Sequence, residues 1–425
     1  MSGKPEQIVI LTYGTRGDVQ PFVALGVGLR DAGYKVRIAA PGAYGEFIQT
    51  LGLEFAPLPG DPGILANQLV EYAGFNPLKM VKAVGEFVLP LAIETMLASR
   101  EACRNADAII HSFLMTDAGH HIALEQGIPD ISGQFFPIFT STGDFPGMTF
   151  PNLPLGRGYR RATHLLTSSI FRYSGRLLYA YLRRKQPDLP RLAEWPFIKK
   201  LRPKTPILYA ISPTVLPRPS DWPSSSIITG YWMLDPPANW TPPVNLVEFI
   251  SAGTPPIFIG IGSIPSKYGQ KLSEIFIQAI NQTRQRAVIA IEGISEDHFE
   301  YPERIFCIDN VPHSWLFPHM KAVIHHGGAG TTAAGLAAGV PNIVIPFASD
   351  QAFWGQRVHE LGAGPKPIHY KQLTAQRLIQ AINTGITNEG VRERAKVLGK
   401  HIRQENGIAG AVQLISKHIA SSNQI

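Results

Sequence analysis

The feature that most constrains the fold is the alternation of short apolar runs with helical patterns in both halves of the chain. In the first half, the apolar runs QIVILTYG and KVRIAAP flank the stretch FVALGVGLRDAG, and ADAIIHSF precedes AGHHIALEQGIP. Gly33 stands where a glycine closes a helix, so the order strand, helix, strand predicts parallel βαβ units. The second half repeats the pattern with PPIFIGIGS, RAVIAIEG, RIFCIDNVP, KAVIHHGG and NIVIPFAS. The sequence therefore predicts an α/β fold of two doubly wound domains.

The 425-residue length also fits two domains, since one domain usually has about 100–200 residues. Between the halves lies LDPPANWTPPVNLVEFISAGTPP, whose proline density disfavours regular structure. We predict an N-terminal domain over 1–235, a linker over 236–256 and a C-terminal domain over 257–405. Residues 406–425 are predicted to form a C-terminal helix, which can pack back on the N-terminal domain. Doubly wound sheets bind ligands beyond the carboxyl ends of their strands, so we expect the domains to face a ligand-binding cleft.

Composition limits the class of function. The net charge of +7 suits an anionic membrane surface, an anionic ligand or a nucleic acid, and equally an ordinary solvated basic surface. Nucleic acid is not expected, because the basic residues are spread along the chain without a recognition module. The 2 cysteines, Cys103 and Cys307, are too few for a disulfide framework and lack metal-ligand spacing, so we expect a cytoplasmic location. The N-terminus is typical of a first strand, and no apolar run reaches the roughly 18 residues that span a bilayer.

The densest basic region, residues 157–191, interleaves arginines with apolar and aromatic residues. This pattern suits basic amphipathic helices that contact a membrane surface. It also suits helices that pack on their own domain with the arginines outside. Peripheral membrane contact is therefore one of two hypotheses for this region.

The stretch HHGGAGTTAAGLAAGVPNIVIPFASDQ, residues 325–351, predicts a strand end, a glycine turn and a small-residue helix. Such a turn places free backbone N–H groups and the positive end of a helix dipole where a phosphate can bind. Neither a dinucleotide fingerprint nor a P-loop is present. Asp350 and Gln351 follow the next strand at the same edge, and a carboxylate beside an amide suits the hydroxyls of a sugar. A diphosphate next to sugar hydroxyls indicates a nucleotide sugar.

Together with NVPHSWLFP at 310–318, this stretch resembles the donor signature of GT-B glycosyltransferases of the UDP-glucuronosyl/UDP-glucosyltransferase superfamily. YGTRGDVQPFVALGVGLRDAGYKV resembles their N-terminal signature, and SPTVLPRPSDWPSSSIITGYWMLD (212–235) is most similar to sterol glucosyltransferases. The resemblance implies two Rossmann-like domains. It also implies inverting, metal-independent transfer of glucose from the co-substrate UDP-glucose to a sterol or similar lipophilic acceptor, with no further cofactor.

The resemblance also implies which residues contact the donor. The expected contacts to the diphosphate are Ser263, His325, Gly328, Ala329, Gly330 and Thr331; those to the nucleobase are Val311 and His313; and those to the sugar are Asp350 and Gln351. Related plant enzymes stack a tryptophan on the base where this chain has Asn310, so the identity of the base stays open.

Asp18, in YGTRGDVQP, is the candidate general base, because attack by an acceptor hydroxyl requires a carboxylate or histidine to take its proton. We expect it in a loop at the carboxyl edge of the first sheet, where plant relatives carry a catalytic histidine. The alternative is that Asp18 caps the following helix. Asp117, in SFLMTDAGHH, is a candidate for a supporting role, although the best match to the plant dyad's aspartate falls on Ser112.

The segment GQFFPIFTSTGDFPGMTFPNLPLG, residues 133–156, can line an apolar acceptor pocket with Phe135, Phe136, Phe139 and Phe145. The alternative is a loop whose aromatic side chains pack on themselves. Three functions stay open: sterol glucosylation, glycosylation of a polyketide, peptide or carotenoid scaffold from a UDP- or dTDP-sugar, and nucleotide-sugar binding without turnover. The oligomeric state is not indicated.

Overall fold

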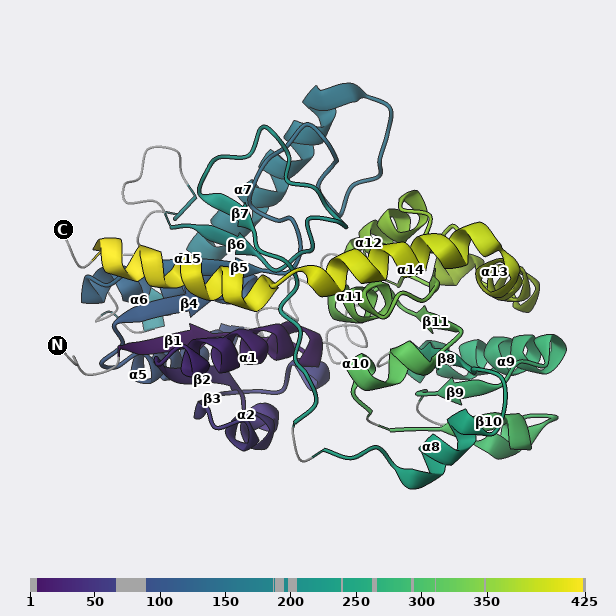
Figure 1. The fold of residues 1–425 in the computed structure, drawn as a ribbon. Coiled ribbons are helices and arrows are strands. Elements are labelled where there is room, and N and C mark those ends of the chain that lie inside the picture. The colour runs from purple at the N-terminus through teal and green to yellow at the C-terminus, as the bar shows by residue number, and fades with distance from the viewer. Residues whose placement is uncertain are drawn as a thin grey trace. The chain divides into compact units, whose positions relative to one another are not determined.

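The computed structural model describes residues 6–65, 89–185, 187, 195–197, 205–237, 240–261, 266–291, 294–309, 311–347 and 349–422. The chain divides into two compact units (Figure 1). Unit 1 comprises Met1–Pro213, Pro217–Met233 and Asn406–Ile425, and unit 2 comprises Thr214–Leu216 and Leu234–Glu405.

Unit 1 contains a parallel sheet of seven strands among its described residues, in the order β3-β2-β1-β4-β5-β6-β7. The order reverses between β1 and β4, which makes the carboxyl ends of these two strands the switch point where doubly wound sheets bind ligands. The strands are β1 (Gln7–Leu11), β2 (Lys35–Pro41), β3 (Glu54–Leu58), β4 (Ala108–His111), β5 (Asp130–Gln134), β6 (Ile207–Tyr209) and β7 (Ser226–Ile228).

Helices separate the strands from β1 to β6 along the chain, as the sequence pattern predicts, whereas the described residues between β6 and β7 form no helix. They are α1 (Arg16–Asp31), η1 (Gly42–Tyr44), α2 (Gly45–Thr50), α5 (Leu89–Ala102), η3 (Phe113–Met115), α6 (Thr116–Gln126), the long α7 (Gly156–Lys185) and α15 (Gly407–Ser422). In the part of the chain that the structure describes, no helix combines the length and apolarity needed to cross a bilayer.

Unit 2 contains a second parallel sheet, with five described strands in the order β10-β9-β8-β11-β12. The strands are β8 (Ile257–Gly260), β9 (Ala287–Ile289), β10 (Ile305–Cys307), β11 (Ala322–His325) and β12 (Asn342–Val344). The helices are α8 (Val244–Ser251), α9 (Ser266–Thr283), η4 (Glu296–His298), η5 (Pro302–Arg304), α10 (His313–Leu316), η6 (Phe317–His319), α11 (Ala329–Ala338), α12 (Ser349–Glu360), η7 (Tyr370–Gln372), α13 (Ala375–Thr387) and α14 (Glu389–Gln404).

The core of unit 2 lies on both faces of its sheet, because neighbouring strand residues point to opposite faces. Ile257 and Ile259 pack in the same cluster as Phe276 of α9. Phe258, between them, packs instead in the cluster that holds Leu246 of α8. Both sheet faces are therefore covered, and the prediction of two doubly wound parallel sheets is confirmed.

The predicted linker, 236–256, is not a structureless connection. Within it, Val244–Ser251 form α8, whose Leu246 is fully buried in unit 2. The prolines flank this helix, and Pro243 occupies its N-cap position, so they bound a regular element without interrupting it. Apart from Thr214–Leu216, unit 2 accordingly begins at Leu234.

The C-terminal helix α15 belongs to unit 1 and packs on α1. A Cβ atom at Gly28 of α1 would lie 2.2 Å from Cγ2 of Ile408, so the absence of a side chain lets the two helices approach closely. The hydroxyl of Tyr34 donates to Oγ of Ser416 at 2.7 Å. These contacts hold the C-terminal end of α1. Asp18 lies at the other end of the helix, in its first turn.

Candidate active site

Asp18 lies in the first turn of α1 and not in the preceding loop, where the sequence analysis placed it. The N-cap residue of α1 is Thr15, and its backbone N–H and its hydroxyl donate to Oδ2 of Asp18 at 2.7 and 3.0 Å. A Cβ atom at Gly14, whose φ is +138°, would lie 2.3 Å from the same Oδ2. The carboxylate thus takes part in a capping box, and glycine before it leaves the space that the carboxylate occupies.

Other polar side chains from the same sheet edge surround Asp18. Burial raises the pKa of Tyr44, the negative charges of Asp18 and Asp61 raise it further, and Arg16 lowers it. Tyr44 follows β2 and Asp61 follows β3, so three neighbouring strands contribute to this cluster. Tyr44 and Asp61 are not among the site residues predicted from the sequence, although their position directly after predicted strands was a signal that could have found them.

Asp117 lies in the first turn of α6, and its carboxylate packs against α7. A Cβ atom at Gly175 of α7 would lie 1.9 Å from Oδ2 of Asp117. Burial raises the pKa of Asp117 to about 6, although His120 and Arg176 lower it. Asp117 is therefore about half protonated near pH 6, and it lies at the contact between α6 and α7.

The neighbouring His120 pairs with a different aspartate. His111 Nε2 and His120 Nδ1 lie 3.0 and 2.9 Å from Oδ2 of Asp130, and the hydroxyl of Thr205 donates to the same carboxylate. Burial alone would raise the pKa of Asp130, but the hydrogen bonds from the two histidines hold it well below its usual range. This buried network joins β4, α6 and β5, and it is not among the features predicted from the sequence.

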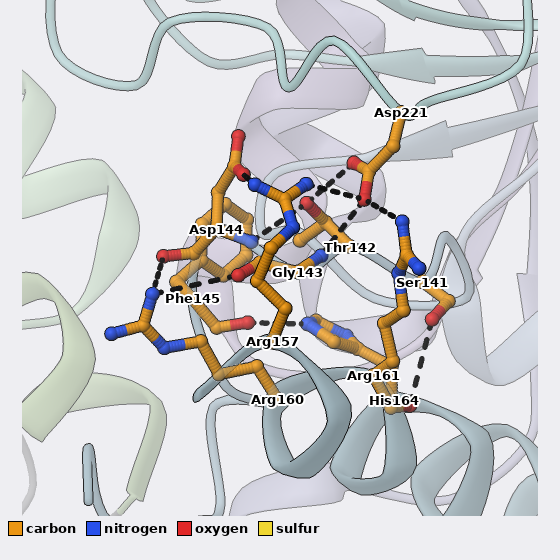
Figure 2. A network of polar contacts seen from close by, with 10 residues as sticks. All are labelled: Ser141, Thr142, Gly143, Asp144, Phe145, Arg157, Arg160, Arg161, His164 and Asp221. Carbon is orange, nitrogen blue, oxygen red and sulfur yellow. Dashed lines mark hydrogen bonds and ion pairs between the residues drawn. The ribbon is translucent and has the colours of Figure 1, made fainter. Parts of the chain in front are cut away.

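The four phenylalanines proposed for the acceptor fall into two groups. Phe136 and Phe139 are buried, at 7% and 8% exposure, and Phe139 stacks on Phe197 with centroids 5.1 Å apart. Phe135 and Phe145 are half-buried; the Phe145 carbonyl accepts from His164 of α7 (Figure 2). In this structure Phe136 and Phe139 follow the self-packed alternative, whereas Phe135 and Phe145 stay candidates for acceptor contact.

In unit 2, the glycine turn between β11 and α11 has the geometry of an anion site. Gly327 has a φ of +92°, and a Cβ atom there would lie 2.7 Å from Val344 Cγ1 and 2.8 Å from the Gln351 carbonyl oxygen. Gly328 is the N-cap residue of α11, no side chain caps this helix, and its first turn has no acidic residue. The N–H groups of Ala329, Gly330 and Thr331 therefore face the turn without a capping carboxylate.

His325 does not take the role that the resemblance implied for it. It is the last residue of β11, fully buried, and paired in register with Gly260 and Val344. Its Nε2 donates to Oδ1 of Asn342 at 2.9 Å, and its Nδ1 accepts the N–H of Gly327 at 3.0 Å. Burial lowers its pKa to about 3. Both ring nitrogens are hydrogen-bonded within the protein, one to Asn342 of β12 and one to the Gly327 N–H of the turn. His325 is therefore a structural residue.

His326 is the histidine that a ligand of the turn can reach. It is partly exposed, and its ring lies against Gly328, where a Cβ atom would be 2.6 Å from Nε2. Its Nδ1 is buried without a hydrogen-bond partner among the described residues. Burial lowers its pKa to about 4, so the ring is neutral at pH 7. A neutral imidazole beside an uncapped helix can donate one hydrogen bond to a phosphate oxygen.

Asp350 and Gln351 lie in the first turn of α12, beside this glycine turn. Burial raises the pKa of Asp350, while hydrogen bonds from the backbone N–H groups of Asp350 and Gln351 lower it. Oε1 of Gln351 accepts the N–H of Phe347 at 2.8 Å, which fixes the side chain. The structure thus brings the glycine turn, residues 328–331 among the predicted diphosphate contacts, and the two predicted sugar contacts to one edge of the sheet.

The two residues predicted to contact the nucleobase pack against other side chains of unit 2. Val311 is buried in the core cluster of α8 and α10. The ring of His313 stacks on Phe317, with centroids 4.3 Å apart, and Trp315 packs on Trp240. Ser263, expected at the diphosphate, and Asn310 lie outside the described residues, and the role of Ser263 stays a prediction.

Both halves of the chain match known protein families. Residues 8–139 match the N-terminal domain of glycosyltransferase family 28, and residues 275–409 match the C-terminal domain described as erythromycin biosynthesis protein CIII-like. Sterol 3-beta-glucosyltransferase UGT80A2 of Arabidopsis thaliana is 38% identical over 439 residues, which cover 99% of this chain and 67% of that protein. The chain belongs to the sterol 3-beta-glucosyltransferase family. UGT80B1 of the same plant is 35% identical over 97% of this chain and 68% of its own length. The family member of Cryptococcus neoformans is 33% identical, and the chain spans 28% of its length.

Solved structures of other glycosyltransferases have the same fold as this family member. The calicheamicin glycosyltransferase CalG4 is 17% identical, with a TM-score of 0.67 over 98% of this chain and 99% of that chain. VinC, solved in complex with dTDP, is 18% identical, with a TM-score of 0.69 over 99% and 100%. The sterol 3-beta-glucosyltransferase fold is thus GT-B, as predicted, and the chain is a glycosyltransferase.

Proposed function

We propose that the chain transfers glucose from UDP-glucose to the hydroxyl group of a sterol, with inversion at the anomeric carbon and without a metal ion. The observation that carries the proposal is the 38% identity, over 99% of the chain, to a protein named as a sterol 3-beta-glucosyltransferase. A carboxylate at the switch point of one sheet and an uncapped helix beside His326 in the other supply the two chemical functions that such transfer needs.

Unit 2 binds the donor in this proposal. The N–H groups at the start of α11 and Nε2 of His326 donate to the diphosphate, and Asp350 and Gln351 bind the glucose hydroxyls. As the bond between the glucose C1 and the diphosphate oxygen breaks, negative charge grows on the leaving group. Fixed donors aimed at that charge stabilise the transition state, which is the role that a metal ion has in other enzymes.

Unit 1 supplies the general base. Asp18 accepts the proton of the sterol hydroxyl while the oxygen of that hydroxyl attacks C1 of glucose. The Asp18 carboxylate becomes a carboxylic acid as the diphosphate leaves. The capping box holds Oδ2 in a fixed position through two hydrogen bonds, and preorganisation of this kind lowers the cost of reaching the reactive geometry. Asp18 is thus a capping residue and a base at once, which unites the two alternatives of the sequence analysis.

We propose a cytoplasmic location and peripheral association with a membrane, because a sterol acceptor resides in lipid. Cys103 and Cys307 are both free thiols, and burial raises the pKa of each to about 12. Neutral, unpaired thiols fit a reducing compartment.

The test is a transfer assay read by mass spectrometry. Purified protein is incubated with UDP-glucose or dTDP-glucose and with sterols in detergent micelles or polar polyketide aglycones. Addition of one hexose to a sterol from UDP-glucose is the expected result. Transfer to polar scaffolds alone would replace this proposal with the natural-product alternative, and donor binding without transfer to any acceptor would contradict both.

A further inference from the structure

The outward face of α7 is apolar along the middle of the helix. Leu166, Ile170, Tyr173 and Leu177 are 51%, 56%, 58% and 75% exposed. They follow one another at intervals of four, three and four residues, so they form a single line along the helix. We call these four residues the apolar stripe. Exposed helix faces are normally polar, and an apolar line of this length marks an interaction surface.

The opposite face of α7 is held by contacts that fix the helix orientation. At the N-terminal end, Arg157 and Arg161 form ion pairs with Asp221 at 3.3 and 2.9 Å, as Figure 2 shows. Further along, Phe171 packs edge-on against Phe139, with centroids 5.4 Å apart. The apolar stripe therefore faces outward as a consequence of the fold.

The C-terminal half of α7 is held in the same way. Gly175 lies against Asp117, and the buried Tyr179 pairs its hydroxyl with Nε2 of His121 at 3.0 Å. Phe171, Gly175 and Tyr179 are spaced by four residues and so share the inward face. The apolar stripe can therefore meet a partner without rotation of α7 about its axis.

The charge of α7 indicates what kind of partner covers the apolar stripe. The helix carries eight basic residues and no acidic one; the basic residues are Arg157, Arg160, Arg161, Arg172, Arg176, Arg183, Arg184 and Lys185. Arg157 and Arg161 have acidic partners, but Arg184 and Lys185 are exposed at the end of the apolar stripe. The guanidinium of Arg172 lies 5.7 Å from the ring centroid of Tyr173, within the stripe.

We propose that α7 lies along the surface of an anionic bilayer, with the apolar stripe among the upper acyl chains and with Arg184 and Lys185 at the lipid phosphates. Apolar burial and attraction to anionic lipids both favour this arrangement, and they act together in surface-bound amphipathic helices. A second copy of the chain fits the stripe less well, because it would bring a second set of the same positive charges.

This inference names the surface and the lipid charge for the membrane association proposed above, and it rests on the proposed function only for its biological purpose. Vesicle flotation tests the binding without any sugar transfer. Flotation of the whole protein is compared on vesicles of phosphatidylcholine alone and of phosphatidylcholine with phosphatidylserine. The wild-type protein should float with the vesicles that contain phosphatidylserine, and less so in high salt.

Two sets of variants locate the contact. The double variant Leu166→Glu/Leu177→Glu should reduce the partition coefficient by at least about tenfold, because each exposed leucine gives up the burial of an apolar side chain. Arg184→Gln/Lys185→Gln should reduce the preference for phosphatidylserine and leave weak binding to neutral vesicles. The matched control is Leu124→Glu on α6, since Leu124 is 54% exposed and lies in the same unit; it should float like the wild type.

Measuring sterol glucosylation in micelles and in vesicles distinguishes failure of the membrane inference from failure of the proposed function. With sterol in detergent micelles, Leu166→Glu/Leu177→Glu should match the wild type; with sterol in anionic vesicles it should be at least about tenfold slower. Absence of sterol transfer by the wild type in micelles would overturn the proposed function and leave the flotation result standing. Equal flotation of the double variant and the wild type would overturn the membrane inference, as would a concentration-dependent dimer of the wild type that the double variant fails to form.

Discussion

The turn after β1 and the turn after β11 are built alike but are closed differently. Each joins a central parallel strand to a helix through a glycine with positive φ, Gly14 in unit 1 and Gly327 in unit 2. The third residue of α1 is Asp18, which caps its own helix; the third residue of α11 is Thr331, and no side chain caps that helix. The turn after β1 carries a fixed negative charge, whereas the turn after β11 leaves the first backbone N–H groups of α11 without a capping side chain. The presence or absence of a capping carboxylate thus decides whether such a turn suits a base or an anion.

The largest expected effect removes the charge from the capped turn. Asp18→Asn keeps an oxygen that can accept from Thr15 but cannot take a proton, so kcat for sterol glucosylation should fall about 100- to 10,000-fold. UDP affinity and melting temperature should stay near those of the wild type. Asp18→Ala is the companion variant, with an added loss of about 0.5–2 kcal/mol in unfolding free energy from the missing cap. Full activity of Asp18→Asn would leave Asp18 with the capping role alone.

The next effect separates the two histidines of the uncapped turn. His326→Ala should weaken UDP binding by about 10- to 100-fold, the loss of one hydrogen bond to a charged group. Its stability should change little. His325→Ala should instead lower the unfolding free energy by about 2–4 kcal/mol, because Asn342 and the Gly327 N–H lose buried partners. Isothermal titration and thermal unfolding measure the two effects; the reverse pattern would restore His325 as the donor contact.

Glycine substitutions test how tightly the uncapped turn is built. Gly327→Ala should cost about 2–4 kcal/mol, since its φ is +92° and the new methyl group meets Val344 and the Gln351 carbonyl. Gly330→Ala, at an exposed helical position with nothing within 4 Å, should be neutral or stabilise by up to about 1 kcal/mol. Chemical denaturation distinguishes them, and equal effects would mean that the turn adapts.

A smaller effect makes the second turn resemble the first. Thr331→Asp puts a carboxylate at the position in α11 that Asp18 has in α1, and it should weaken UDP binding by about tenfold through repulsion of the diphosphate. The neutral Thr331→Asn is the control for size and should bind more tightly than the aspartate. Stability of the aspartate variant should be unchanged or slightly higher, because negative charge favours a helix N-terminus. Equal affinities of the two variants would place the diphosphate elsewhere.

The smallest effect concerns another helix with an acidic first turn, α6. Burial raises the pKa of Asp117 to about 6, above its ordinary 3.8, so the folded state prefers the protonated form. Stability is therefore lost as the pH rises from about 4 to 6 and stays lower above that range. Asp117→Asn should be up to about 3 kcal/mol more stable than the wild type at pH 8 and equal to it at pH 4. Denaturation at the two pH values measures this, and a constant difference would contradict the raised pKa.

Much of the fold follows from patterns that act over short stretches. Apolar runs bounded by glycine predict the parallel strands, and the glycine turn before TTAAGLAAG predicts the start of α11. The choice between His325 and His326 depends on where β11 ends, and the ladders with Gly260 and Val344 keep His325 in the strand. A shift of one residue reverses which side chain is buried, and local patterns do not resolve boundaries that finely.

The outward face of α7 could not be predicted for a related reason. Apolar residues such as Leu166, Phe171, Leu177 and Tyr179 occur on both sides of the helix. Only contacts with distant residues, Phe139 and those around Asp117 among them, select the inward side. Proline density around α8 misled in the opposite direction, because prolines outside a helix delimit it as readily as prolines inside one break it.

The placement of α15 in unit 1 has a consequence for how the protein is made. Its residues follow those of unit 2 along the chain, so a ribosome releases all of unit 2 before the helix that covers Gly28 emerges. Unit 2 can fold early, whereas unit 1 stays incomplete, with the face of α1 around Gly28 uncovered until α15 is made. Nascent chains stalled before residue 406 should bind chaperones through unit 1, and they should release them once α15 has been synthesised.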